Sequence, residues 1–244
     1  MNTQSYIQFA LLKLVLVTSL IAVNPVVIAA DDEAVSKSLT TLFRASRKVI
    51  SDNQSMINDE SKGEKGLSGA AVAQMAMDNY QKAAGSPLAK NPAENAMLAA
   101  VKEVMADAQD LINQQGVGFK GFLPAVFARQ VATRFSQKMS GSMTIKLTAP
   151  KKYVRNRANR PDKWEHNIIE AKFSSEGYER GKPFSESAAI KGKMAFRYIL
   201  PEYYGESCLG CHGKPEGELD ITGGKKEGGV LGELGGAISL AIFK

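Results

Sequence analysis

Cysteine and histidine are scarce in this 244-residue chain, which contains only two of each. Two cysteines exclude a scaffold held by several disulfides and a four-cysteine zinc site, and two histidines exclude any site that needs three of them. The chain also has no large excess of either charge. It contains 31 Lys and Arg and 25 Asp and Glu, which gives a formal net charge of +6. So modest an excess argues against a nucleic-acid partner.

The first 30 residues contain no acid and a single base, Lys13. An apolar run over residues 14–23 is followed by Asn24-Pro25 and by small residues that end in Ala29-Ala30. Because a membrane-spanning helix needs about 20 apolar residues, this pattern predicts a signal peptide over residues 1–30 rather than a transmembrane helix. We therefore expect an exported, periplasmic protein that is attached to a membrane only if the signal segment stays uncleaved.

Helical periodicity dominates the next part of the chain, residues 34–140. Apolar residues recur at three, four and seven positions, and this spacing predicts helices over 34–57, 70–84, 91–111 and 124–139, with a glycine-containing loop over 58–69. Asn91-Pro92-Ala93-Glu94 has the cap, early proline and early acid of a helix start. The helix that follows should bury Met97, Val101, Val104, Ala108 and Leu111.

The last part of the chain, residues 141–244, has a different pattern. Short alternating or β-rich runs predict strands of one antiparallel sheet over 142–148, 194–200 and 236–243. Eleven of the 22 glycines lie between Gly205 and Gly236, where they allow close approach of the backbone to a bulky planar group or simply form long turns. Residues 31–244 are expected to form one α+β domain whose helical N-terminal part packs against the sheet.

Three of the four scarce residues lie in one run, Cys208-Leu209-Gly210-Cys211-His212. Cys-x-x-Cys-His is the attachment signature of haem c. Two intervening residues place both sulfurs on the same side of about one helical turn, where each can form a thioether with one vinyl group, and the adjacent histidine can ligate the iron. The motif predicts one covalently attached haem, with His212 as the proximal iron ligand.

Other interpretations of the cysteine pair are weaker. A thioredoxin-like redox pair should begin a helix after a strand of a βαβ unit, and the surrounding turns do not suggest one. A disulfide across two residues closes too short a loop to stabilise much. A zinc site would need further ligands, which His166 and an acid could supply only by coincidence.

Three stretches give the chain its resemblance to a known family. They are Ser46 to Leu67 (SRKVISDNQSMINDESKGEKGL), Tyr153 to Glu165 (YVRNRANRPDKWE), and Phe196 to Gly213 (FRYILPEYYGESCLGCHG) with the closing strand from Gly236. The chain resembles bacterial haem c-binding, PAS-like sensor domains, which occur alone or as the extracytoplasmic part of histidine kinases and chemoreceptors. The resemblance implies a single haem c held against a PAS-like antiparallel sheet. It also implies a stand-alone member that passes its signal to a partner protein.

The sixth iron ligand is the main open question of the sequence. Both cysteines are used by the thioethers, so a thiolate is excluded. The candidates are His166, a methionine such as Met56, Met139 or Met194, another weak ligand, or none. The choice matters because a second strong ligand favours electron transfer, whereas an open position can bind a small gas.

Arginines are candidates for the haem propionates, because the planar guanidinium matches a carboxylate. Arg155, Arg160 and Arg197 lie in the resembling stretches, and Arg197, on a predicted strand close to the motif, is the preferred residue. We expect a redox or small-ligand sensor module, or alternatively a periplasmic one-electron carrier that exchanges electrons with a partner cytochrome. Nothing in the sequence marks a distal acid-base pair, so an enzyme is not expected.

Overall fold

The computed structural model describes residues 25–244, with side chains from residue 31. Most of the predicted signal peptide therefore lies outside the described residues, and only the backbone of 25–30 is included, as the start of the first helix. Within residues 25–244, no helix combines the length and the hydropathy that crossing a bilayer requires.

The first part of the described chain is helical, as predicted. It contains α1 (Pro25–Asp52), α2 (Gln54–Ile57), α3 (Gly69–Ala84), α4 (Pro92–Ile112) and α5 (Pro124–Lys138). The single helix expected over 34–57 is two helices, because the chain leaves helical geometry at Asn53, whose side-chain Nδ2 donates to Val49 O at 2.7 Å.

The start of α4 has the predicted capping arrangement. The Asn91 side chain accepts from the backbone N–H of Glu94, and the Glu94 carboxylate accepts from the backbone N–H of Asn91. The expected apolar stripe is buried except at its last member, since Leu111 is exposed and Ile112 is buried instead. The heptad spacing fails there because the 3.6-residue turn of a straight helix has moved the buried face by one position.

A four-stranded antiparallel sheet forms the second part of the fold, in the order β1-β4-β3-β2. Its strands are β1 (Met143–Thr148), β2 (Phe184–Ile190), β3 (Lys193–Tyr203) and β4 (Leu234–Phe243). Three of them were predicted. The edge strand β2 was not predicted. It is joined to β3 through Lys191 and Gly192, both with positive φ, in the geometry of a tight hairpin.

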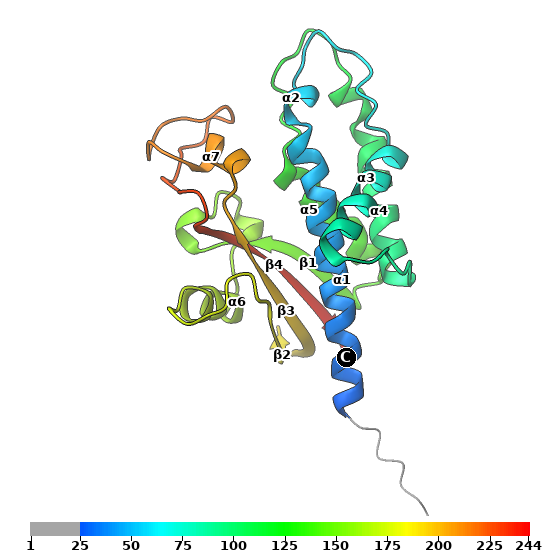
Figure 1. Cartoon of the computed structure of the whole chain (residues 1–244), viewed down its shortest axis with the longest axis vertical. Helices are drawn as coiled ribbons and strands as arrows, with labels where there is room; N and C mark the ends of the chain where they lie inside the picture. Colours follow the sequence, from blue (N-terminus) through cyan, green and yellow to red (C-terminus); the bar gives the residue numbers. More distant parts are fainter. Residues whose placement is uncertain (1–24) are drawn as a thin grey trace, which may run out of the picture.

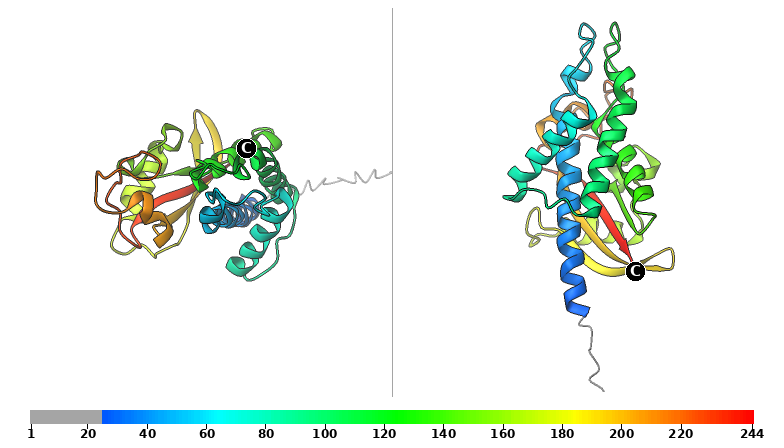
Figure 2. Two further views of the ribbon diagram at one scale, coloured as in Figure 1. Left: turned by 90° about the horizontal axis from the view of Figure 1, so that it is seen from above. Right: turned by 90° about the vertical axis from the view of Figure 1, so that its right-hand side faces the viewer.

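The two faces of the sheet are covered by different elements. Alternate residues of β3, including Phe196, Tyr198 and Leu200, join the same apolar cluster as the helices, and α1 packs against both β3 and β4. On the other face, Ile199 packs with Ile168 and Ile169 of η3 (Ile168–Phe173, a π-helix), which continues the short helix α6 (Lys163–Asn167). Helices α1 to α5 therefore form one layer beside the sheet, with α1 along the boundary, and α6 lies on the other side (Figures 1 and 2). The predicted α+β class is confirmed.

The end of the sheet positions the cysteine motif. Two single-turn helices, η1 (Lys151–Tyr153) and η2 (Arg157–Asn159), follow β1. At its C-terminal end, β3 has an irregularity in its pairing with β4 at Glu202/Tyr203, and the chain then continues into α7 (Glu206–His212). Such bulges turn a strand and redirect the chain. The motif thus lies beyond the last residues of a central strand, near the C-terminal half of α1 (Figure 1).

Candidate functional site

The short helix α7 contains the whole motif. It begins after Gly205 and ends at Gly213, whose backbone N–H donates to Leu209 O at 2.9 Å. Cys208 and Cys211 are three residues apart, about one turn, so their side chains project from the same side. Both thiols are half-buried and free.

One nitrogen of the His212 ring is already engaged. His212 Nδ1 lies 2.9 Å from Glu227 Oε2, and since an ionised carboxylate only accepts, Nδ1 carries the proton and donates. This tautomer leaves Nε2 with its lone pair, the form in which histidine ligates a metal. The backbone is also fixed, because His212 O accepts from the Gly229 N–H at 2.8 Å.

Tyr204 holds the histidine ring from the side. The two rings stack with centroids 5.4 Å apart and an interplanar angle of 18°. An added Cβ at Gly229 or Gly235 would lie 2.6 Å or 2.4 Å from the Tyr204 ring, so these two glycines allow the backbone to approach it. The glycine-dense segment therefore wraps a planar group of the protein itself.

The hydroxyl of Tyr204 is buried and has no hydrogen-bond partner among the described residues. Burial, and after it the negative charge of Glu227, raises the pKa of Tyr204 well above its ordinary value. The phenol is therefore a neutral group beside His212. Its unused hydroxyl is one of the few buried polar atoms in the described chain that lack a partner.

Arg155 links the segment after the motif, residues 220–227, to the motif through hydrogen bonds. Its guanidinium donates to the carboxylates of Glu227 and Asp220 and to two backbone carbonyls, Cys211 O and Lys225 O. Burial alone would lower the pKa of Arg155, but its hydrogen bonds with Glu227 and Asp220 outweigh this and raise it. We define Arg155, Asp220 and Glu227 as the acidic cluster; its formal charge is −1. Because its guanidinium is used by these protein groups, Arg155 is a poor candidate for a haem propionate.

Asp220 forms the other end of this cluster. Its Oδ1 accepts from the backbone N–H groups of Thr222 and Gly224 and from the Thr222 hydroxyl. Burial alone would raise the pKa of Asp220, but the hydrogen bonds from Arg155 and Thr222 outweigh it and hold the pKa well below its ordinary value. The turn is thereby built around an ionised carboxylate.

The geometry disfavours the redox and zinc interpretations of the cysteine pair. The helix α7 follows a strand of an antiparallel sheet, whereas a thioredoxin-like pair should follow a strand of a βαβ unit. Within the part of the chain that the structure describes, no three His, Cys, Asp or Glu residues are grouped as metal ligands.

Arg197, the preferred propionate partner, is placed differently from the expectation. Its side chain is only 2% exposed and donates to Asp162 Oδ2 at 2.7 Å, with Glu165 Oε1 at 3.6 Å. The indole of Trp164 covers it, with the guanidinium carbon 4.1 Å from the ring centroid. These contacts hold α6 against the sheet, and the Nε of Arg197 is buried without a hydrogen-bond partner among the described residues. Arg160 is exposed, and the structure shows no link between it and the motif.

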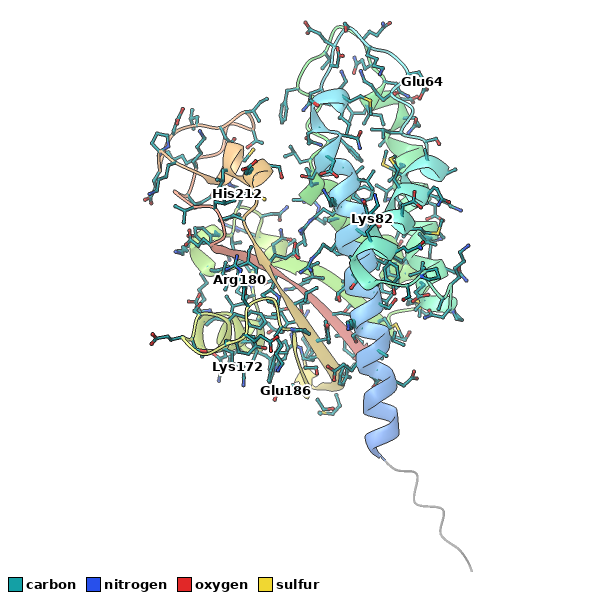
Figure 3. The ribbon with its side chains drawn as sticks, viewed as in Figure 1. Glu64, Lys82, Lys172, Arg180, Glu186 and His212 are labelled. Carbon is teal, nitrogen blue, oxygen red and sulfur yellow. The ribbon has the colours of Figure 1, made fainter. Side chains whose placement is uncertain are left out.

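Three candidates for the sixth ligand lie away from the motif. Met194 is at the start of β3, which is about 30 Å along the strand from Tyr203, and Met139 follows α5 beside the same end of the sheet. His166 is on α6, which contacts the middle of β3, about 20 Å along the strand from α7, and its Nδ1 lies 3.8 Å from Glu170 Oε1. In Figure 3, His212 is correspondingly far from Glu186, the residue on β2 that accepts from Trp164.

Met56 is the one named methionine at the same end of the molecule as α7. It lies on α2, directly after α1, and is half-buried against the helical core. The C-terminal end of α1 approaches the motif at Ser51, whose Oγ lies 3.4 Å from Ser207 Oγ. Of the four named candidates, Met56 is therefore the one whose position still allows it to be the sixth iron ligand.

Sequence reasoning missed the residues that fix His212. Glu227 and Asp220 lie in a polar, glycine-rich segment where acids are common, and Tyr204 lies four residues before Cys208 without a distinguishing pattern. The one signal was Arg155, which was chosen for its guanidinium and whose acceptors in the structure are the carboxylates of Glu227 and Asp220.

Comparison with protein-family models identifies one family. A family model described as Tll0287-like matches residues 28–242, nearly all of the chain outside the N-terminal segment. No curated protein and no solved structure matches the chain. On the strength of that match, the chain belongs to the Tll0287-like family.

Proposed function

We propose that this protein binds one haem c covalently through Cys208 and Cys211, with His212 as the proximal iron ligand. The observation that carries the proposal is the state of His212, whose Nδ1 donates to Glu227 so that Nε2 is available, one residue from a free thiol. Membership of the Tll0287-like family, together with the resemblance to haem c-binding PAS-like domains, supports it. The residues around α7 therefore fit the group.

When bound, the haem supplies a one-electron redox centre that can also bind a small ligand. The chain's own residues set its surroundings. Cys208 and Cys211 anchor it at two points, and Glu227 and Tyr204 fix the tautomer and the orientation of the His212 ring. The interactions of Arg155 with Glu227 and Cys211 O hold these residues to the motif.

We propose a redox or small-ligand sensor rather than an electron carrier or an enzyme. The position of His166, Met139 and Met194 away from α7 supports this role, because it leaves fewer strong protein ligands for the far side of the iron. The signal-peptide pattern of residues 1–30 supports export to the periplasm, where haem c is attached in bacteria. A partner protein would then read the state of the haem.

Expression with a haem c maturation system tests the central claim. The purified protein should contain one haem that stays with the polypeptide in acidified organic solvent and adds the mass of one haem. A C208S/C211S variant should lose this covalent haem. Extraction of the colour from the wild type would refute the proposal.

Ligand binding then separates sensor from carrier. If the reduced protein takes up CO or NO, the far side of the iron is open or weakly ligated, as a gas sensor needs. An absorption band characteristic of methionine ligation in the oxidised protein would favour the carrier. M56L is the variant that should then abolish the band.

A further inference from the structure

The motif helix lies between two groups of opposite charge. On the His212 side is the acidic cluster, whose formal charge is −1. On the α1 side, Arg44 and Arg47 both donate to a single carboxylate, that of Glu202 on β3. We call Arg44 and Arg47 the arginine pair. Among the described residues, Glu202 is their only acidic partner within ion-pair distance, so this side has an excess of one positive charge.

The arginine pair is directed toward the motif by the helix that carries it. Arg44, Arg47 and Ser51 are spaced by three and four residues and share one face of α1. That face reaches α7, since Ser51 Oγ lies 3.4 Å from Ser207 Oγ, next to Cys208. Glu202, the residue of β3 that pairs with both arginines, is also close to α7, because it is four residues before the start of that helix.

The excess charge is partly shielded from water. The side chain of Arg47 is 24% exposed and that of Glu202 is 15% exposed. Burial, and then the charge of Arg44, lowers the pKa of Arg47 to about 10, and the proximity of Cys208 opposes this shift. A second anion would relieve the strain of two like charges on one carboxylate.

We propose that Arg44 and Arg47 bind a propionate of the haem that is attached at Cys208 and Cys211. This inference rests on the proposed function. In this arrangement the charges of the haem and of the protein would be complementary. The cationic iron would be next to the acidic cluster, and the propionate carboxylate would be next to the arginine pair. Arg197, expected from the sequence to hold a propionate, is already enclosed by Asp162, Glu165 and Trp164.

The experiment compares the haem-loaded wild type with R47Q, R44Q and R47K. Lys214 is exposed and two residues beyond His212, so K214Q removes the same charge close to the motif in sequence and is the matched control. The first readouts are covalent haem content and mass. A wild type without covalent haem refutes the proposed function and the inference together, whereas a loaded wild type leaves only the inference under test.

Two further readouts decide the inference. Loss of one guanidinium should favour the oxidised haem, so the ratio of reduced to oxidised protein at a fixed potential should fall about tenfold in R47Q, which is ~59 mV for one electron. R47K should fall less, and K214Q less than twofold. The propionate-bending mode in the resonance Raman spectrum should shift in R47Q and R44Q and stay unchanged in K214Q. R44Q keeps the test available if R47Q does not fold, since the Arg44 side chain is 43% exposed.

Three results would overturn the assignment. An unchanged propionate mode in both glutamine variants would exclude the contact, and an equal potential shift in K214Q would reduce it to a general field effect. Inorganic phosphate offers the same oxygen chemistry. If phosphate at constant ionic strength moves the wild-type potential but not that of R47Q, the arginine pair holds a solvent anion instead.

Discussion

Arg155 should be the residue on which the segment after the motif depends most. Its side chain is 27% exposed, while the side chains of its partners Asp220 and Glu227 are 0% and 13% exposed. Replacing it with methionine in R155M keeps an unbranched apolar stem but leaves two shielded carboxylates without their cation. Breaking a fully buried pair costs about 3–5 kcal/mol, and the partial exposure of Arg155 reduces this to about 2–3 kcal/mol.

Native-state hydrogen exchange measures this loss locally. The amides of Gly228 and Gly229, which donate to Gly213 O and His212 O, close the segment back onto α7. Their exchange should accelerate roughly 30- to 140-fold in R155M, since about 1.4 kcal/mol corresponds to a factor of ten. R155K, which keeps the charge but not the fork, should have a smaller effect. The control is R157M at an exposed arginine nearby. Acceleration below about threefold, or an equal acceleration in β3 and β4, would refute the reasoning.

The remaining predictions concern the pH and the ring of His212. Because the folded-state pKa of Asp220 is depressed, its contribution to stability is fully present above the unfolded value of about 4 and is lost on acidification below it, so the protection factor of the Gly228 amide should fall there, and an unchanged protection factor at pH 3 would contradict this. G235A should cost about 1–3 kcal/mol in urea unfolding, because its Cβ would lie 2.4 Å from Tyr204, whereas G205A meets open space; equal midpoints would contradict it. E227Q should raise the reduction potential of the loaded protein, since His212 loses its anionic acceptor. A lower potential would argue against that hydrogen bond.

Local patterns predicted most of the helical part because the determinants of a helix lie within a few residues. The capping residues Asn91 and Glu94 are three positions apart, and the buried face of α4 follows from its own periodicity. The edge strand β2 has no such signal. Its sequence FSESAAI is half exposed and not alternating, and it is a strand because β3 beside it offers an unpaired edge.

The candidate site divides in the same way. The motif Cys208 to His212 is local, and the structure places it on one short helix as its spacing predicted. The partners of His212 are not local: Glu227 is 15 residues away and is held by Arg155, 72 residues from it. No spacing rule connects positions so far apart. Only the register of the strands and the turn around Asp220 bring them together.

The arginines show what chemistry alone can predict. A guanidinium predicts that a carboxylate will be its partner, but the fold decides which one, and for Arg155 and Arg197 the partners are acids of the protein. Arg44 and Arg47 have a signal that could have been used, because neither has an acid three or four residues away on α1. Their partner must therefore come from another element or from a ligand. Glu202 supplies one negative charge to two arginines, so the scarcity of acids on this face, more than the presence of arginine, indicates where an external carboxylate can bind.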